Sequence, residues 1–205
     1  MTVLVHTNIT MKCVLQDLQG DVQWTKDGFG FSFNRSVPGQ PRISITGNDQ
    51  GYVRSFNLHI TDVQLSDDDK YTCQVSPGHD TPPLIARATL TVTAPPEEPF
   101  IENYSNNSKV EVHYNSSSVQ LVCVARAGKP AVNIFWYRDG QRVTENIEYE
   151  TIPLTPSKKV TARSKLTISL DNYREENQRQ YKCEVQRGPL WTEPLRPAVV
   201  TLDIL

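Results

Sequence analysis

The side chains with the most evident capacity for chemistry are four cysteines, which form two pairs with the same spacing along the chain. The first pair is Cys13 and Cys73, and the second is Cys123 and Cys183. Zinc sites usually contain close Cys-x-x-Cys pairs, and none occurs here. Oxidation is therefore the predicted chemistry, and each disulfide would close a loop of about 60 residues and stabilise its fold by about 4 kcal/mol. Such bonds persist in oxidising compartments.

The remaining reactive side chains do not form a recognisable catalytic set. The four histidines are dispersed, and the chain has no Gly-x-Ser-x-Gly run, no His-Glu-x-x-His run and no glycine-rich phosphate loop. The net charge is −2 and the basic residues are scattered, so the sequence lacks the electrostatic footprint of a protein that binds nucleic acid or an anionic membrane. We therefore expect no enzyme activity, no cofactor, no small-molecule substrate and no nucleic-acid partner.

Each cysteine pair encloses a tryptophan that follows its first cysteine, and a tyrosine stands two residues before its second cysteine. These residues are Trp24 and Tyr71 in the first half, and Trp136 and Tyr181 in the second. The spacing is the signature of the immunoglobulin sandwich, in which a disulfide joins strands B and F of opposite sheets and the tyrosine hydroxyl turns back to the backbone. The signature predicts one disulfide within each cysteine pair.

Apolar residues alternate with polar ones around these positions, which is typical of strands with one buried face. The fold class is therefore predicted to be all-β, with two tandem immunoglobulin-like β-sandwiches of roughly 100 residues each. We place domain 1 at residues 1–94 and domain 2 at residues 100–205, joined by a linker at residues 95–99. Three of the six residues from Ala94 to Pro99 are prolines, which lack the N–H that a ladder needs, so the linker is predicted to be short and stiff.

Three consecutive aspartates, Asp67 to Asp69, distinguish the first domain from the second. Asp67 lies six residues before the second cysteine, where V-type domains pair an aspartate with an arginine at the start of strand D, and Arg42 stands there. Domain 2 has Asn177 at the equivalent position. We therefore predict a V-like domain 1 and a C2- or I-like domain 2 that lacks this ion pair. A calcium site is the alternative, but calcium needs about six or more converging oxygens, which three carboxylates on an extended turn do not supply; we expect no metal.

Five Asn-x-Ser/Thr sequons together with paired cysteines indicate a secreted or extracellular protein. The predicted glycosylation sites are Asn8, Asn34, Asn103, Asn106 and Asn115. The sequence shows no signal peptide and no run of about 18 or more apolar residues. Because the chain opens almost inside a strand, with little room for a strand A, we expect a fragment of a longer protein that is attached to a membrane only through a missing transmembrane segment.

Several runs of residues resemble the nephrin and Neph (Kirre, Roughest, SYG) family of cell-recognition proteins. In the first domain these are residues 22–30, 38–47 and 66–75, and weaker matches are residues 94–99 and 128–131. The resemblance implies the first two extracellular domains of a type I single-pass membrane protein at the cell surface. It also implies that domain 1 binds itself or a related immunoglobulin-superfamily protein on an apposed cell, through the sheet of strands C, C′, F and G.

Alternation predicts which residues of that sheet face outward, because the tryptophan of strand C and the second cysteine of strand F point inward. The hairpin turn Asp27-Gly28 would place Phe29 opposite Lys26 at the tip, where Phe29 either folds under the sheet or projects as an apolar anchor. Phe33 is expected to pack rather than to make contacts. The resulting face is predicted to be uncharged and low in relief. The predicted protein-binding residues are Gln23, Thr25, Phe29, Gly30, Ser32, Gln74 and Ser76.

Two further features bear on partner choice. Ser32 stands where the family usually has glycine, so it adds a side chain to the predicted face. The loop of residues 77–84 would rim that face, and a glycan on Asn34 would have to point away from it. The fold alone leaves two alternatives open: a receptor ectodomain for a soluble or unrelated protein ligand, and a structural spacer. Aggregation of beads coated with the fragment would favour adhesion over both.

Overall fold

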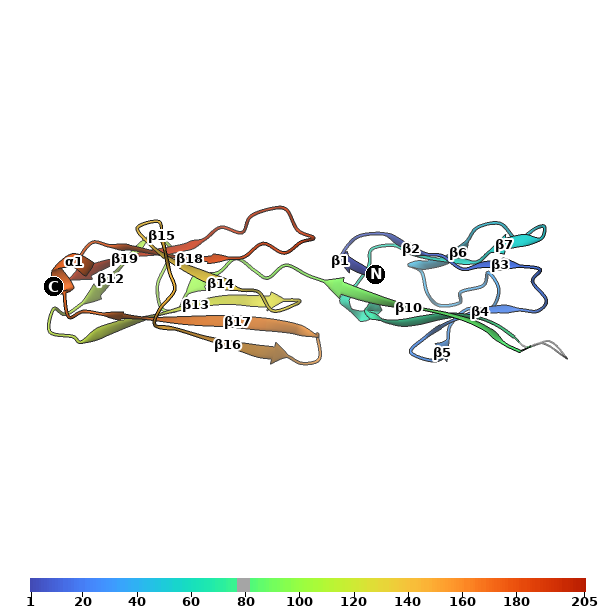
Figure 1. Ribbon diagram of the computed structural model, residues 1–205, viewed down its shortest axis with the longest axis horizontal. Coiled ribbons are helices and arrows are strands. Elements are labelled where there is room, and N and C mark those ends of the chain that lie inside the picture. Colours follow the sequence, from blue (N-terminus) through green and yellow to red (C-terminus); the bar gives the residue numbers. More distant parts are fainter. Residues whose placement is uncertain (77–81) are drawn as a thin grey trace. The chain divides into compact units, whose positions relative to one another are not determined.

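The computed structural model describes residues 1–76 and 82–205. The chain divides into two units, Met1–Thr93 and Ala94–Leu205, and each is an all-β sandwich with its own disulfide (Figure 1). The predicted fold class is confirmed: a V-like immunoglobulin domain is followed by a C2-set domain.

Unit 1 consists of two main sheets and a short two-stranded extension. The first sheet has the order β1 (Thr2–Leu4), β10 (Leu84–Thr93), β9 (Asp69–Val75), β4 (Val22–Lys26) and β5 (Phe29–Gly30). The second has the order β2 (Ile9–Met11), β8 (Asn57–Ile60) and β6 (Ile43–Thr46), and the extension pairs β3 (Val14–Gln16) with β7 (Val53–Ser55). A 3-10 turn, η1 (Leu65–Asp67), leads from β8 to β9.

The core of unit 1 is formed by the apolar faces that alternation predicts. Trp24 is 2% exposed, and its Nε1 donates a hydrogen bond of 2.7 Å to the backbone oxygen of Phe56. The disulfide Cys13–Cys73 is present as predicted, with 6.4 Å between its Cα atoms. A buried indole needs a partner for its N–H, so this hydrogen bond and the disulfide together join the two sheets.

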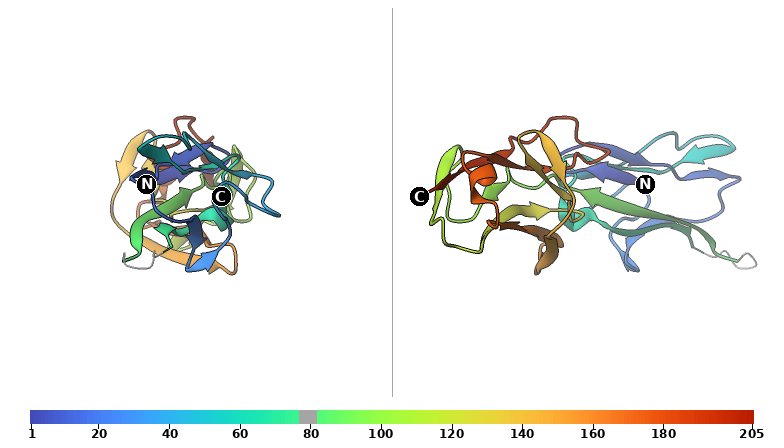
Figure 2. Two further views of the ribbon diagram at one scale, coloured as in Figure 1. Left: turned by 90° about the vertical axis from the view of Figure 1, so that its right-hand side faces the viewer. Right: turned by 60° about the vertical axis from the view of Figure 1, so that its left-hand side comes forward.

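Unit 2 also consists of two sheets, and its one helix among the described residues is a single turn, α1 (Tyr173–Glu176), visible near the C-terminus in Figure 2. One sheet has the order β11 (Phe100–Ile101), β13 (Ser118–Gly128), β17 (Lys159–Ser169) and β16 (Ile147–Leu154). The other has the order β12 (Ser108–Val112), β19 (Ala198–Ile204), β18 (Gln180–Val185), β14 (Ile134–Arg138) and β15 (Gln141–Val143).

The core of unit 2 repeats the arrangement with a different partner for its tryptophan. Trp136 is fully buried, and its Nε1 donates to the Ser164 hydroxyl at 3.0 Å. The predicted disulfide Cys123–Cys183 is present, again with 6.4 Å between the Cα atoms. Because both disulfides join cysteines separated by 60 residues, they restrict their unfolded chains to a similar extent.

The proline-rich segment between the sandwiches lies along β13 of unit 2. Ala94 and Lys129 form an antiparallel bridge, and the Glu97 N–H donates to the Arg126 oxygen at 2.8 Å. Pro96 is buried beside Gly128, where a Cβ atom would come within 3.2 Å of the proline ring. Ala94 before the prolines and Glu97 between them therefore donate the hydrogen bonds that the prolines cannot.

Candidate protein-binding face

The outer surface of the five-stranded sheet of unit 1, called the front face here, is ordered by a regular ladder. Gln23 on β4 lies opposite Gln74 on β9, and Gln74 lies opposite Ile85 on β10. Thr72 in the next row lies between Thr25 and Arg87. Cross-strand partners point to the same side of a sheet. The described residues of the front face are Gln23, Thr25, Gly30, Lys70, Thr72, Gln74, Ile85, Arg87 and Thr89.

The centre of the front face is a pair of amides over a glycine. Gln74 Nε2 donates to Gln23 Oε1 at 2.9 Å. A Cβ atom on Gly30 would lie only 2.5 Å from Gln23 Nε2, so the Gln23 side chain lies flat across the glycine backbone. Any larger residue at position 30 would displace this amide, and the centre of the face would lose its low relief.

Two of the predicted contact residues expose very little surface. Thr25 and Ser32 are each 4% exposed. Phe31 N–H donates to Trp24 O at 3.1 Å, but Trp24 N–H donates to the Ser32 hydroxyl at 2.8 Å rather than returning to the Phe31 oxygen as a regular ladder would. The expectation that Ser32 adds a side chain to the outer face is therefore wrong, because its hydroxyl satisfies a buried backbone donor where the ladder ends.

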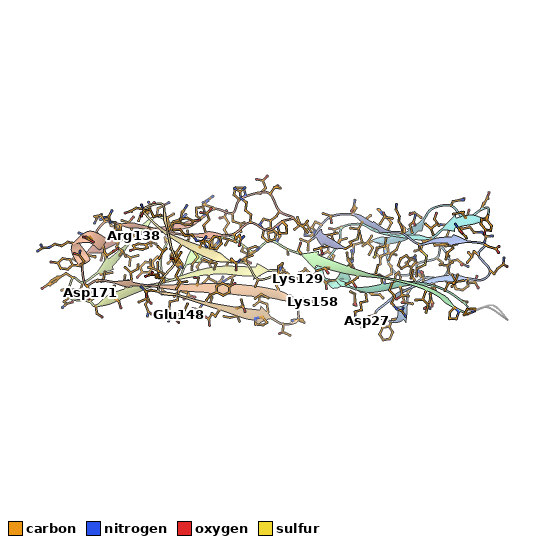
Figure 3. The ribbon with its side chains drawn as sticks, viewed as in Figure 1. Asp27, Lys129, Arg138, Glu148, Lys158 and Asp171 are labelled. Atoms are coloured by element: carbon orange, nitrogen blue, oxygen red, sulfur yellow. A yellow bond between two sulfur atoms is a disulfide. The ribbon has the colours of Figure 1, made fainter. Side chains whose placement is uncertain are left out.

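The tip of the β4–β5 hairpin, at an end of the front face, carries the most exposed large apolar side chain of the described residues. Asp27 and Gly28 have φ angles of 47° and 84°, as the predicted two-residue turn requires; Figure 3 labels Asp27 at this tip. Phe29 pairs with Lys26 as predicted and is 78% exposed, so of the two alternatives it projects. Phe33 is 57% exposed, and the expectation that it packs is wrong.

Strand β10 contributes an apolar and a basic residue that the sequence analysis did not assign to this face. Ile85 is 45% exposed, and Arg87 is exposed in the next row. Lys70 on β9 is a second exposed cation. The expectation of an uncharged face is therefore wrong. Arg87 and Ile85 lie an odd number of positions before the buried Leu90, so alternation along the strand places both outward.

The turn that enters β9 holds an ion pair with a buried carboxylate, which confirms the predicted pairing of Arg42 with Asp67. Arg42 Nη1 and Nη2 donate to the two Asp67 oxygens at 2.7 and 3.0 Å, and the Gln64 N–H donates at 2.8 Å. Burial alone would raise the pKa of the Asp67 carboxyl, but the hydrogen bonds from Arg42 and Gln64 outweigh it and hold that pKa below its usual range. The Tyr71 hydroxyl donates to Asp67 O at 2.8 Å, which completes the tyrosine corner.

The other two aspartates of the triplet face different partners. Asp68 accepts from the Val92 N–H at 2.7 Å, and Asp69 accepts from the Lys70 N–H at 2.8 Å. Within the described residues there is no group of three or more acidic, histidine or cysteine side chains that could hold a metal ion. The triplet thus organises the backbone around the start of β9.

Comparison with known proteins identifies the family to which this chain belongs. Residues 1–84 match the immunoglobulin domain, and residues 99–193 match the CD80-like C2-set immunoglobulin domain. The chain is 36% identical to the Irregular chiasm C-roughest protein of Drosophila melanogaster over 188 residues, which are 90% of this chain and 24% of that protein. The crystal structure of Rst D1-D2 superposes with a TM-score of 0.87 at 32% identity, covering 100% of this chain and 95% of the other. The chain belongs to the Roughest and Kin of IRRE family.

Human Kin of IRRE-like protein 1 is another relative, 35% identical over 169 residues, which are 82% of this chain and 21% of that protein. The chain thus spans about a quarter of the length of these curated relatives, or less. Bovine butyrophilin shares only the fold, with a TM-score of 0.62 at 17% identity. Membership makes this chain part of the ectodomain of a cell-recognition protein rather than an enzyme, and its relatives are cell-surface proteins. None of the helices in the described part of the chain is long and apolar enough to cross a membrane.

The sequons of this Roughest-family chain differ in how their asparagines are held. Asn34 is half-buried: its Oδ1 accepts from the Val22 N–H and its Nδ2 donates to Asp21, both at 2.9 Å. The other four asparagines, Asn8, Asn103, Asn106 and Asn115, are exposed. Ser76 at the end of β9 is exposed, and the loop expected to rim the face lies partly outside the described residues, at 77–81. Glycosylation of all five asparagines stays a prediction.

Proposed function

We propose that this chain is the recognition end of a cell-adhesion receptor, in which the front face of unit 1 docks onto another family member on an apposed cell. The observation that carries the proposal is the flat amide pair Gln23–Gln74 over Gly30, bordered by the projecting Phe29. Interfaces concentrate their binding energy in a few large side chains, with aromatic residues prominent among them. Low relief around such an anchor allows a second sheet to approach closely.

The energetic demands of such a contact are modest. A specific interface buries about 1,600 Å² in total, roughly half of it on each partner. The front face offers an exposed aromatic ring, the half-exposed Ile85, and amide groups that can exchange hydrogen bonds with a partner. Micromolar affinity for a single contact is in keeping with adhesion, because many copies on two membranes multiply the overall binding strength.

The test replaces Phe29 and, as a control, an exposed aromatic residue on the side of the other sheet of unit 1. Phe29→Asp puts a charge at the tip of the face and should abolish aggregation of beads coated with the fragment, whether with themselves or with beads that carry a relative. Tyr52→Asp is the control, since Tyr52 is 67% exposed and precedes β7, which belongs to the extension of the other sheet. Full aggregation of the folded Phe29→Asp protein would reject the front face as the docking site.

A further inference from the structure

The guanidinium of Arg87 lies on the front face, where no partner for it is found in the part of the chain that the structure describes. The ladder places Arg87 opposite Thr72, which in turn is opposite Thr25, and β1 pairs only with Thr91–Thr93, so the cation lies at the β10 edge of the face. Within the described residues, no hydrogen bond or ion pair to its side chain is found. Its neighbours Ile85, Thr72 and Gln74 carry no charge, and Lys70, next but one to Thr72 on β9, is a second cation.

A docked sheet would remove water from this guanidinium. Burying a charge without a counter-charge is unfavourable, whereas a carboxylate that faces an arginine forms a pair of short, directional hydrogen bonds. One acid at an end of the face is Asp27 at the hairpin tip, whose N–H donates to Lys70 O at 2.9 Å. That acid stands beside a second cation, Lys70, and no ion pair within 4.0 Å joins it to Arg87.

We propose that Arg87 determines partner choice: the front face favours a related sheet that presents a carboxylate opposite Arg87 over a second copy of this chain. This inference rests on the proposed docking function and specifies its partner. In a complex of two identical copies, each Arg87 would find neutral side chains and the cations Lys70 and Arg87, but no carboxylate, among the described residues in the rows of the partner face. A relative with an acidic residue in those rows converts the same desolvated cation into a specific contact.

The experiment supplies the carboxylate on a second copy. Four single variants, Gln23→Glu, Thr72→Glu, Gln74→Glu and Ile85→Glu, each add one acid to the front face. Wild type is immobilised, and its equilibrium binding to wild type and to each variant is measured by surface plasmon resonance in about 50 mM and about 500 mM salt. At low salt at least one variant should bind wild type about five- to tenfold more tightly than wild type binds itself. That gain should disappear at high salt and when the immobilised protein carries Arg87→Gln.

A matched control replaces a cation on the other sheet. Lys12 is exposed between β2 and β3, so Lys12→Gln on the immobilised protein should leave the gain unchanged. If no acidic variant gains affinity while wild type still associates with itself, the inference about Arg87 is overturned and the docking face stands. If Asp27→Asn weakens self-association as much as Arg87→Gln does, the carboxylate comes from a second copy, which also overturns it. If no pair binds at all, the docking function and this inference fail together.

Discussion

The two tyrosine corners of this chain start from the same Tyr-x-Cys pattern and end with different hydrogen bonds. In unit 1 the Tyr71 hydroxyl donates to a backbone oxygen, Asp67 O, at 2.8 Å. In unit 2 the Tyr181 hydroxyl donates to a side chain, Glu176 Oε2, at 2.5 Å. Burial raises the pKa of both phenols, and in unit 2 the Glu176 carboxylate raises it further. Both hydroxyls are therefore protonated donors throughout the physiological pH range.

The ion pairs at the two corners also connect different parts of the sandwich. Arg42 precedes β6 in one sheet and reaches Asp67 in the turn that enters β9 of the other sheet. Nη1 of this arginine also donates to the Thr61 and Asp62 oxygens at 3.3 and 3.0 Å. The pair in unit 1 therefore fastens the two sheets together where the chain passes between them.

The corresponding pair of unit 2 stays on one side of its sandwich. Arg138 at the end of β14 reaches Glu176 at 2.7 Å, and Tyr181 lies directly opposite Arg138 in the ladder. Arg138 Nε has no partner within the described residues. Asn177, which replaces the aspartate of unit 1, accepts from the Ile204 N–H at 3.0 Å instead. The comparison teaches that the acid of a tyrosine corner can either join two sheets or brace one, depending on where its arginine stands.

Removal of the acid should separate the two units most clearly. Asp67→Ala leaves the Arg42 guanidinium and the Gln64 N–H without their acceptor, and we expect unit 1 to lose about 3 kcal/mol of stability. Glu176→Ala should cost unit 2 about 2 kcal/mol, because it removes the acceptor of the Tyr181 hydroxyl, whereas Arg138 is 37% exposed and can be hydrated. Hydrogen exchange measured by mass spectrometry reports each unit separately. Equal losses of stability in the two units would show that an ion pair that joins two sheets stabilises its unit no more than one that lies on a single sheet.

Removal of the tyrosine hydroxyls should reverse the order of the two units. Tyr181→Phe removes a hydrogen bond to a carboxylate and should cost about 2 kcal/mol, whereas Tyr71→Phe removes one to a neutral carbonyl and should cost about 1 kcal/mol. Denaturant unfolding of each variant, with hydrogen exchange to assign the unit, measures both values. A larger loss for Tyr71→Phe than for Tyr181→Phe would contradict this order. It would mean that the hydrogen bond from Tyr71 to the Asp67 backbone stabilises its unit more than the hydrogen bond from Tyr181 to the Glu176 carboxylate does.

The sequence predicted the parts of this molecule that depend on spacing and alternation. The two disulfides, the pairing of Arg42 with Asp67 and the opposition of Phe29 and Lys26 all follow from counting along strands whose register the turns define. Arg87 could have been placed outward by the same count. These features are local or are determined by the immunoglobulin pattern, so they need no knowledge of side-chain packing.

The features that the sequence did not predict depend on exceptions to the ladder. The hydroxyl of Ser32 accepts from the Trp24 N–H in place of a backbone oxygen because β5 ends at Gly30. No residue type in the sequence indicates that the strand ends there. The acid of the second corner moved from the position of Asn177 to Glu176, where a longer side chain meets an arginine on a different strand. Such substitutions of one polar group for another are decided by three-dimensional proximity, which alternation does not encode.

Acid provides the mildest test of the difference between the corners. The pKa of Asp67 is lower in the folded chain than in the unfolded chain, so the folded state binds fewer protons, and its stability falls as the pH drops from about 4 through the folded pKa. In unit 2 Asp139 and Asp203 also have lowered pKa values, but their carboxylates are much more accessible to solvent, which screens their interactions. Between pH 7 and pH 3, hydrogen exchange corrected for its intrinsic pH dependence should therefore show unit 1 weakening more than unit 2. In Asp67→Asn that difference should vanish, because no carboxyl at position 67 remains to take up a proton; an unchanged difference would assign the acid sensitivity to another group.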